Sequence, residues 1–263
     1  MSIKNNSNRK VIASVQNALR ILNLFENGVH ELGNSEIAKR LNMDPGTVAG
    51  LIFTLKINKY LDQNPDNRKY RLGLKIAERA AVLLNQMDIR KTAAPFLEDL
   101  RDWSGESVNL AIRDNHEVVY IERMFGNHAL GIRSEVGKRA PIHSTALGKA
   151  IIANFSAEEL KSVLENYNFC ALTPYTETDR GKFVQRLELI RTRGFAIDEQ
   201  ENELGGRCVG APIFGHLGQP VAAISLSIPL HRFPEERIEE IGNRVKVAAM
   251  DISQALGFID NSE

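Results

Sequence analysis

Apolar residues recur with the period of an α-helix in the first stretch of the chain. Between positions 14 and 28 they fall on one face, with Ser14 as a candidate N-cap and Gly28 as a candidate stop: Val15, Ala18, Leu19, Leu22 and Phe25. The spacing predicts a helix here.

Two shorter helices are predicted next, separated by the three-residue turn Asn-Met-Asp. Asn34 or Ser35 can cap the first, whose inner face is Ile37, Ala38 and Leu41. Asp44 is the N-cap of the second, and Pro45 takes its first position, where a missing N–H costs nothing. This arrangement is typical of a helix-turn-helix.

A hairpin is predicted in "YLDQNPDNRKYRLG", residues 60–73, around its Asn-Pro-Asp-Asn turn. Three helices and a hairpin make a winged helix-turn-helix over residues 11–73. A helical pattern continues from Leu74 to about Asp102 and breaks near Met87, which predicts a linker helix over 74–88.

The remainder, residues 89–263, alternates strand-like and helical segments. "ESVNLAIRD" and "EVVYIERMFG" read as paired strands, and "QPVAAISLSIPL" is apolar enough for a central strand. Strands in hairpins surrounded by helices predict an α+β domain on an antiparallel sheet.

The charge is distributed unevenly along the chain. Residues 1–73 hold 11 Lys+Arg against 6 Asp+Glu, while residues 74–263 hold 22 against 27. The basic N-terminal part favours a polyanionic partner; chance unevenness of the surface is the alternative. Residues 1–10, "MSIKNNSNRK", are predicted to be a disordered basic arm.

Several classes of protein are disfavoured. No apolar run approaches the roughly 20 residues of a membrane span, which predicts a cytoplasmic protein with no membrane partner. Cys170 and Cys208 have no pairing pattern, and the six histidines show no ligand spacing. We expect neither a metal nor a cofactor.

The segment "APIHSTALGKA" is a candidate ligand site. Ser144 or Thr145 can cap a helix whose free N–H groups, at Ala146 and Leu147, would attract a carboxylate. The alternative is an ordinary capped helix packed on a sheet.

Together these segments resemble the IclR family of bacterial transcription regulators, from about Ser14 to Leu256. The stretches that carry the resemblance are "SVQNALRILNLF", "EIAKRLNM", "YRLGLKIAERA", "RSEVGKRAPIHSTALGKAI", "RTRGFAIDEQENELGGRCVGAPIF" and "AAISLSIP". The resemblance implies a winged helix-turn-helix, a linker helix and a GAF-like effector domain. It also implies homodimers formed through the DNA-binding end, which often pair into homotetramers.

Effector-binding positions of the family map by motif onto Ile132, Ala140, Ala146, Leu147, Asp198, Cys208, Ser225 and Ser227. Considered alone, Cys208 would be a buried small hydrophobe and Asp198 a surface carboxylate. Ser225 and Ser227 alternate on one strand, so both hydroxyls should share a face. The hypothesis is a small carboxylic acid, hydroxylated or aromatic. Near such an anion, Asp198 would accept from a ligand hydroxyl or amine, or stay protonated.

Residues for phosphate contacts are present at the DNA-binding end: Arg9, Lys10, Ser35, Lys39, Arg40, Lys56, Lys59, Arg68 and Lys69. Base readout is less obvious, because the second helix carries Pro45, Gly46, Ala49 and Gly50 where relatives typically place longer polar residues.

Three interpretations of this departure compete. The helix can lie close to the bases because Gly46 and Gly50 remove side-chain bulk, with Thr47, Ala49 and Phe53 contacting thymine methyl groups. The wing tip or the arm can read DNA shape and the minor groove instead. A third interpretation is weakened DNA binding.

The predicted function is a ligand-responsive, DNA-binding transcription regulator with no catalytic residues, whose partners are double-stranded operator DNA and a small effector. One alternative is a ligand-binding module that no longer contacts DNA. Another is an enzyme using Cys208, His143, Ser144 and Asp198, although the sequence has no nucleophile elbow, Cys-x-x-Cys or phosphate loop.

Overall fold

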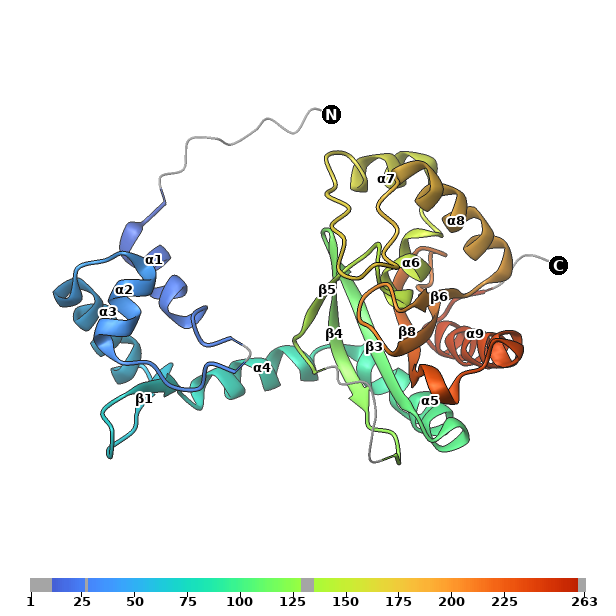
Figure 1. Cartoon of the computed structure of the whole chain (residues 1–263). Helices are drawn as coiled ribbons and strands as arrows, with labels where there is room; N and C mark the ends of the chain where they lie inside the picture. The colour runs from blue at the N-terminus through green and yellow to red at the C-terminus, as the bar shows by residue number, and fades with distance from the viewer. Residues whose placement is uncertain (1–10, 27, 129–134, 260–263) are drawn as a thin grey trace. The chain divides into compact units, whose positions relative to one another are not determined.

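The computed structural model describes residues 11–26, 28–128 and 135–259, and the chain divides into two compact units, Met1–Gln86 and Met87–Glu263 (Figure 1). We refer to them as the N-terminal unit and the C-terminal unit. Three predicted site residues, Arg9, Lys10 and Ile132, lie outside the described residues, as does the arm over 1–10. Among the described residues, no helix is both long and apolar enough to span a membrane.

The N-terminal unit is the predicted winged helix-turn-helix followed by one further helix. Its elements are α1 (Ala13–Leu22), α2 (Asn34–Leu41), α3 (Pro45–Ile57), β1 (Leu61–Gln63), β2 (Tyr70–Leu72) and α4 (Lys75–Asn85). The Asp44 carboxylate accepts a hydrogen bond from the Thr47 N–H at 2.9 Å, so Asp44 caps α3 as predicted. At α2 the prediction was off by one residue: the N-cap is Gly33, whose N–H donates to the Glu36 carboxylate at 2.6 Å.

Helix α1 differs from its prediction in three ways. Its N-cap is Ile12, and the predicted cap, Ser14, lies within the helix. The helix ends at Leu22 rather than near Gly28, because the N–H groups of Leu24 and Phe25 turn back to the carbonyls of Ile21 and Leu22. Val15 and Leu19 do not face the core: they are 55% and 52% exposed, while Ile21 is fully buried. Apolar periodicity in a sequence identifies the apolar face of a helix, but it does not show whether the rest of the protein covers that face.

The C-terminal unit is built on an antiparallel sheet of six strands in the order β5-β4-β3-β8-β7-β6. Its strands are β3 (Ser107–Asp114), β4 (Glu117–Met124), β5 (Arg139–Pro141), β6 (Ala196–Glu199), β7 (Gly206–Phe214) and β8 (Pro220–Pro229). Its helices are α5 (Asp88–Ser104), α6 (Ala146–Ile152), α7 (Ala157–Val163), α8 (Arg180–Arg193) and α9 (Ile238–Ala255), with short 3₁₀ turns at Leu230–Arg232 and Glu235–Arg237. The expected α+β class and the central position of β8 are confirmed.

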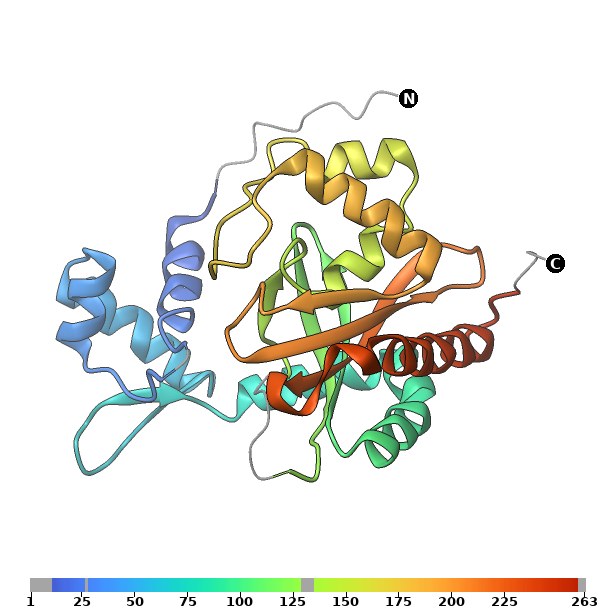
Figure 2. The same cartoon turned by 45° about the vertical axis from the view of Figure 1, so that its right-hand side comes forward.

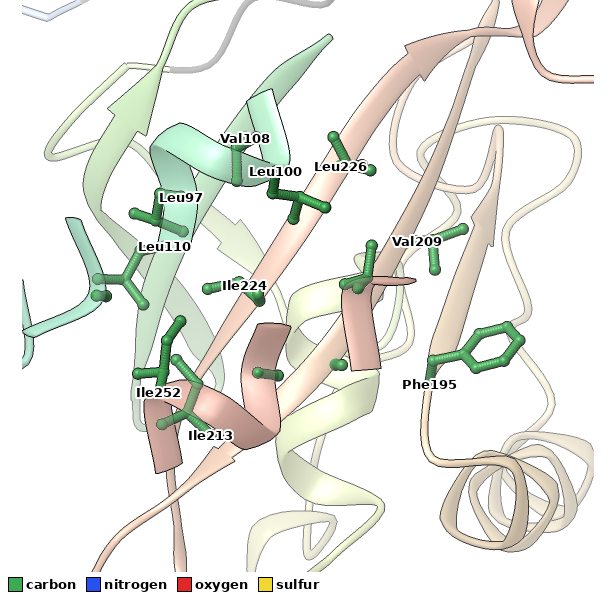
Figure 3. Packing of buried hydrophobic residues seen from close by; sticks show 14 of the residues in the cluster. Leu97, Leu100, Val108, Leu110, Phe195, Val209, Ile213, Ile224, Leu226 and Ile252 are labelled. Atoms are coloured by element: carbon green, nitrogen blue, oxygen red, sulfur yellow. The ribbon is translucent and has the colours of Figure 1, made fainter. Parts of the chain in front are cut away.

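Helices cover both faces of this sheet (Figure 2). Helices α5 and α9 pack on one face around Leu97, Leu110, Ile224 and Ile252, which Figure 3 shows at close range. Helices α6, α7 and α8 cover the other face around Leu147, Phe183 and Leu187. Strand β8 is buried on both sides, which explains its nearly continuous apolar sequence.

Helix α6 lies unusually close to its neighbours, and this fixes the geometry of the site described next. A Cβ at Gly148 would lie 2.4 Å from the Ile142 Cα, and one at Gly210 of β7 would lie 3.0 Å from the Ala146 carbonyl carbon. Two glycines therefore allow the start of α6 to touch both the preceding loop and the sheet.

Candidate ligand pocket and nucleic-acid interface

A small pocket lies where the first turn of α6 meets strands β7 and β8. It has a volume of about 20 Å³ and is lined by Tyr120, Lys138, Thr145, Ala146, Leu147, Asp198, Asn202, Glu203, Cys208, Ser225 and Ser227. That volume holds about one water molecule. Six of the predicted ligand residues therefore lie together: Ala146, Leu147, Asp198, Cys208, Ser225 and Ser227.

The floor of the pocket is a row of small polar groups on adjacent strands. Asn109 donates from Nδ2 to the Ser227 hydroxyl at 3.0 Å and to the Ser225 hydroxyl at 3.5 Å, and the Cys208 thiol donates to Ser227 at 3.3 Å. Strand register brings these side chains together, since Asn109 lies opposite Ser225 and Cys208 opposite Ser227. As predicted, both serines face the same side.

Asp198 is buried rather than on the surface, contrary to the interpretation of that residue alone. Its Oδ1 accepts hydrogen bonds from the N–H groups of Glu201 at 2.7 Å and Asn202 at 3.3 Å. Burial raises the pKa of Asp198 to about 7, and Lys149 lowers that pKa only in part, because the buried Lys149 ammonium forms an ion pair with Glu201. Asp198 thus exchanges a proton in the physiological pH range.

The surroundings of Cys208 keep its side chain in the thiol form. Burial raises the pKa of its thiol strongly, and the neighbouring Asp198 adds to the effect. The thiolate, which is the nucleophilic form, is therefore disfavoured.

Three other predicted residues play different parts. Ala140 lies on β5 opposite Val118 and packs in the core beneath α6 instead of lining the pocket. Ser144 is buried and donates to the Asn202 side chain at 3.3 Å, so it supports the loop that carries Asp198. Of the two candidate caps, Thr145 is the N-cap of α6 and accepts from the Gly148 N–H at 3.1 Å.

His143 is held away from any catalytic role with Cys208. Its Nδ1 lies 2.7 Å from the Tyr167 hydroxyl and its Nε2 lies 3.0 Å from the Cys170 carbonyl. The carbonyl can only accept, so Nε2 carries the proton and Nδ1 accepts from Tyr167. Burial lowers the pKa of His143, which keeps the ring neutral.

The candidate nucleic-acid interface in the N-terminal unit is the exposed side of α3. Gly46, Thr47, Ala49, Gly50 and Phe53 are all exposed there, while Val48 and Ile52 are buried. Ser35 and Lys39 are exposed on α2, the first helix of the helix-turn-helix.

The basic residues near the wing differ in their availability. Lys56 donates to Gln63 at 2.9 Å, and Lys69 lies 3.5 Å from the Glu36 carboxylate. Arg68 is exposed at a positive φ of 60° and has no ion-pair partner within the described part of the chain. Arg68 is thus better placed than Lys69 to contact a phosphate.

Comparison with known proteins finds two domains of one family along the chain. Residues 14–65 match the IclR helix-turn-helix domain, and residues 81–254 match the family described as bacterial transcriptional regulator IclR C-terminal. The second match alone covers more than half of the chain. The chain belongs to the IclR family.

Individual relatives extend over nearly the whole length. The HTH-type transcriptional regulator XynR of Escherichia coli K12 is 38% identical over 248 residues, 94% of this chain and 98% of the relative. KdgR of the same organism is 31% identical over 94% of this chain and 95% of its own. The crystal structure of Thermotoga maritima IclR aligns with a TM-score of 0.79 at 34% identity, covering 94% of this chain and 99% of that one. The chain is thus an IclR-type transcription regulator.

Sequence reasoning on this IclR-family chain missed several residues that line or support the pocket: Asn109, Tyr120, Lys138, Asn202 and Glu203. Asn109 interrupts an apolar strand, which is a signal that a buried polar partner exists. Tyr120 and Lys138 carry no such local signal, since only strand pairing brings them to α6.

Proposed function

We propose that this IclR-type regulator senses a small organic acid in the pocket at the start of α6. The observation that carries the proposal is the convergence of Asp198, Ser225 and Ser227 on the first turn of α6. Such a set combines hydrogen-bond donors and acceptors in a small space, as ligand sites do.

The pocket also suggests how an acid would be held. Helix α6 has only seven residues, so its dipole contributes little, and the expected attraction to that dipole carries less weight than the sequence suggested. Lys138 at the rim supplies a full positive charge, and the serine hydroxyls donate hydrogen bonds. Asp198 would accept from a ligand hydroxyl, or bind beside a carboxylate in its protonated form.

A thermal-shift screen of aliphatic, hydroxylated and aromatic monocarboxylic acids, followed by calorimetry on the hits, tests this proposal. We expect Ser225→Ala/Ser227→Ala and Asp198→Leu variants to bind the hits at least about tenfold more weakly, as loss of one or two hydrogen bonds predicts. Ser162→Ala, exposed on α7, is the matched control. Unchanged affinity in both pocket variants would refute the site.

We also propose that the protein does not turn its ligand over. The protonated Cys208 and the engaged His143 support this, because neither can act as nucleophile or base in this arrangement. Among the described residues, no group of three or more potential metal ligands occurs. Product formation from a bound acid, followed by NMR, would contradict the proposal.

The N-terminal unit is proposed to bind operator DNA in the cytoplasm, with Lys39, Lys56 and Arg68 on phosphates. Arg68→Ala should weaken DNA binding at every sequence. It should also reduce the slope of log affinity against log salt concentration by about one. Lys161→Ala, which removes one exposed positive charge from α7 in the C-terminal unit, is the matched control. An unchanged slope in Arg68→Ala would exclude wing contact.

Finally, we propose that the protein forms homodimers through α1, and that these pair into tetramers. An apolar row is exposed by Val15 and Leu19 on that helix and by Val11 and Ile12 directly before it. An exposed row of this kind favours a protein partner over water.

A further inference from the structure

Helix α3 presents an apolar stripe to the outside of the N-terminal unit. Gly46, Gly50, Phe53 and Ile57 follow one another at spacings of four, three and four residues, which places them on one side of a helix. Phe53 is 64% exposed and Ile57 is 62% exposed. We call these four residues the α3 stripe.

Polar side chains beside the α3 stripe are largely engaged within the protein. Thr54 donates to the Gly50 carbonyl at 3.0 Å, and Lys56 donates to Gln63 at 2.9 Å. The exposed part of α3 carries no arginine, asparagine, glutamine or acidic residue. The side chains there that could pair with base edges through hydrogen bonds are Thr47, Thr54 and Lys56, and the last two are engaged within the protein. Readout by this helix must therefore rest mainly on apolar contact.

Gly50 is not required by the fold. A Cβ there would meet nothing within 4 Å, and the residue does not have a positive φ. Glycine has a lower helix propensity than alanine, so Gly50 lowers the stability of α3. No contact of Gly50 within the described protein offsets that loss. A surface that must approach α3 closely would account for it.

The major groove of DNA offers one apolar group, the 5-methyl group of thymine. Building on the proposed DNA binding, we propose that the α3 stripe selects thymine-rich operator sequences. Phe53 packs against thymine methyl groups, and Gly50 lets the α3 backbone lie against the base edges.

Charge supports DNA as the occupant rather than an apolar protein surface. The N-terminal 73 residues carry 11 Lys+Arg against 6 Asp+Glu. Lys39 and Arg40 on α2 and Lys56 and Lys59 at the end of α3 are all exposed near the stripe in sequence. An apolar strip bordered by cations matches a groove with methyl groups inside and phosphates at its edges.

Replacement of thymine by uracil tests the proposal directly, because it removes the methyl group and leaves the hydrogen-bonding edge intact. The full-length protein is used to select duplexes from a random pool, and the selected sites are remade with uracil at each thymine in turn. We expect about a fourfold loss of affinity at each contacted position, the effect of one buried methyl group.

Variants separate the role of α3 from general DNA binding. Phe53→Ala should bind thymine and uracil duplexes equally, whereas Phe125→Ala, an exposed phenylalanine of the C-terminal unit, should keep the wild-type preference. Gly50→Ala should raise thermal stability and still weaken binding to the selected sites by at least about fivefold, the effect of about 1 kcal/mol. Weaker binding in a more stable protein cannot arise from misfolding.

The experiment distinguishes a failure of the α3 stripe proposal from a failure of the proposed DNA binding. Equal affinity of the wild type for thymine and uracil duplexes would overturn the role of the stripe while leaving DNA binding intact. A thymine preference that survives in Phe53→Ala would also overturn it. If no sequence is enriched, the proposed DNA binding itself fails, and a protein partner becomes the occupant of the stripe.

Discussion

At the scale of single residues, Asp198 determines the electrostatics of the pocket. Burial separates its carboxyl from water, and the nearest cation, Lys149, is already paired with Glu201. The other ionisable groups around the pocket are Tyr120, Lys138, Glu203 and Cys208. Burial raises the pKa of both Tyr120 and Cys208, so neither supplies a charge at neutral pH.

Asp198 should make the stability of the protein depend on pH. Its folded-state pKa, about 7, lies above the ordinary value of 3.8, so its contribution to stability is greatest at low pH and is lost as pH rises through 7. Asp198→Asn mimics the protonated form, so it should match the wild type only below about pH 4, where Asp198 is protonated in both the folded and the unfolded chain, and the two should diverge as pH rises from there to 7. Near pH 8.5 it should unfold at least about 2 °C higher, the shift expected for about 1 kcal/mol.

Fluorescence of the one tryptophan, Trp103 on α5, follows this transition in the C-terminal unit. All other titratable groups are the same in the two proteins, so the difference between the two melting curves isolates Asp198. Parallel pH profiles in wild type and variant would contradict the assignment.

Strand alternation was enough to place Ser225 and Ser227 on one side of β8. The burial of Asp198 could not be predicted, because the residue lies in the polar run "DEQENE", which reads as a surface loop. Its burial follows from the position of α6 across the sheet, and no local pattern carries that information.

At the scale of elements, close approach explains why α6 begins where it does. Gly148 lies against the Ile142 backbone, and the Thr145 cap holds the first turn in place. The sequence predicted a capped helix here, but its closeness to its neighbours depends on tertiary packing.

Gly148→Ala should therefore destabilise the C-terminal unit, by about 1–3 kcal/mol, the usual cost of overpacking. Urea denaturation followed by Trp103 fluorescence measures the change. Gly50→Ala in α3 is the matched control, since a Cβ meets nothing within 4 Å there and the Trp103 transition should not move. A Gly148→Ala variant as stable as the wild type would show that α6 shifts freely.

Apolar periodicity predicted the elements of the N-terminal unit but not which side of α1 is buried. The helices of the N-terminal unit, the turn between α2 and α3, and the hairpin were all predictable, because apolar periodicity and turn residues mark them, although only α3 has the cap that was predicted. The outward side of α1 was not, since Val15 and Leu19 look like core residues in a sequence.

At the scale of the whole molecule, the apolar row on α1 predicts an assembly. Leu19→Glu places a charge in that row and should halve the mass, converting dimers into monomers or tetramers into dimers, as measured by light scattering after gel filtration. Leu189→Glu, at an exposed leucine on α8, should leave the mass unchanged. If Leu19→Glu retains the wild-type mass, α1 is not the interface.

The small pocket in the C-terminal unit has a consequence for timing. A space of about 20 Å³ holds about one water molecule and is much smaller than a typical ligand pocket, so we expect a ligand to enter only when the walls move apart. The rate of that opening, rather than diffusion, would then limit association, and the same barrier would slow release. Such a regulator would keep its liganded state for some time after the acid has disappeared from the cell, so transcription would report recent exposure as well as the present concentration.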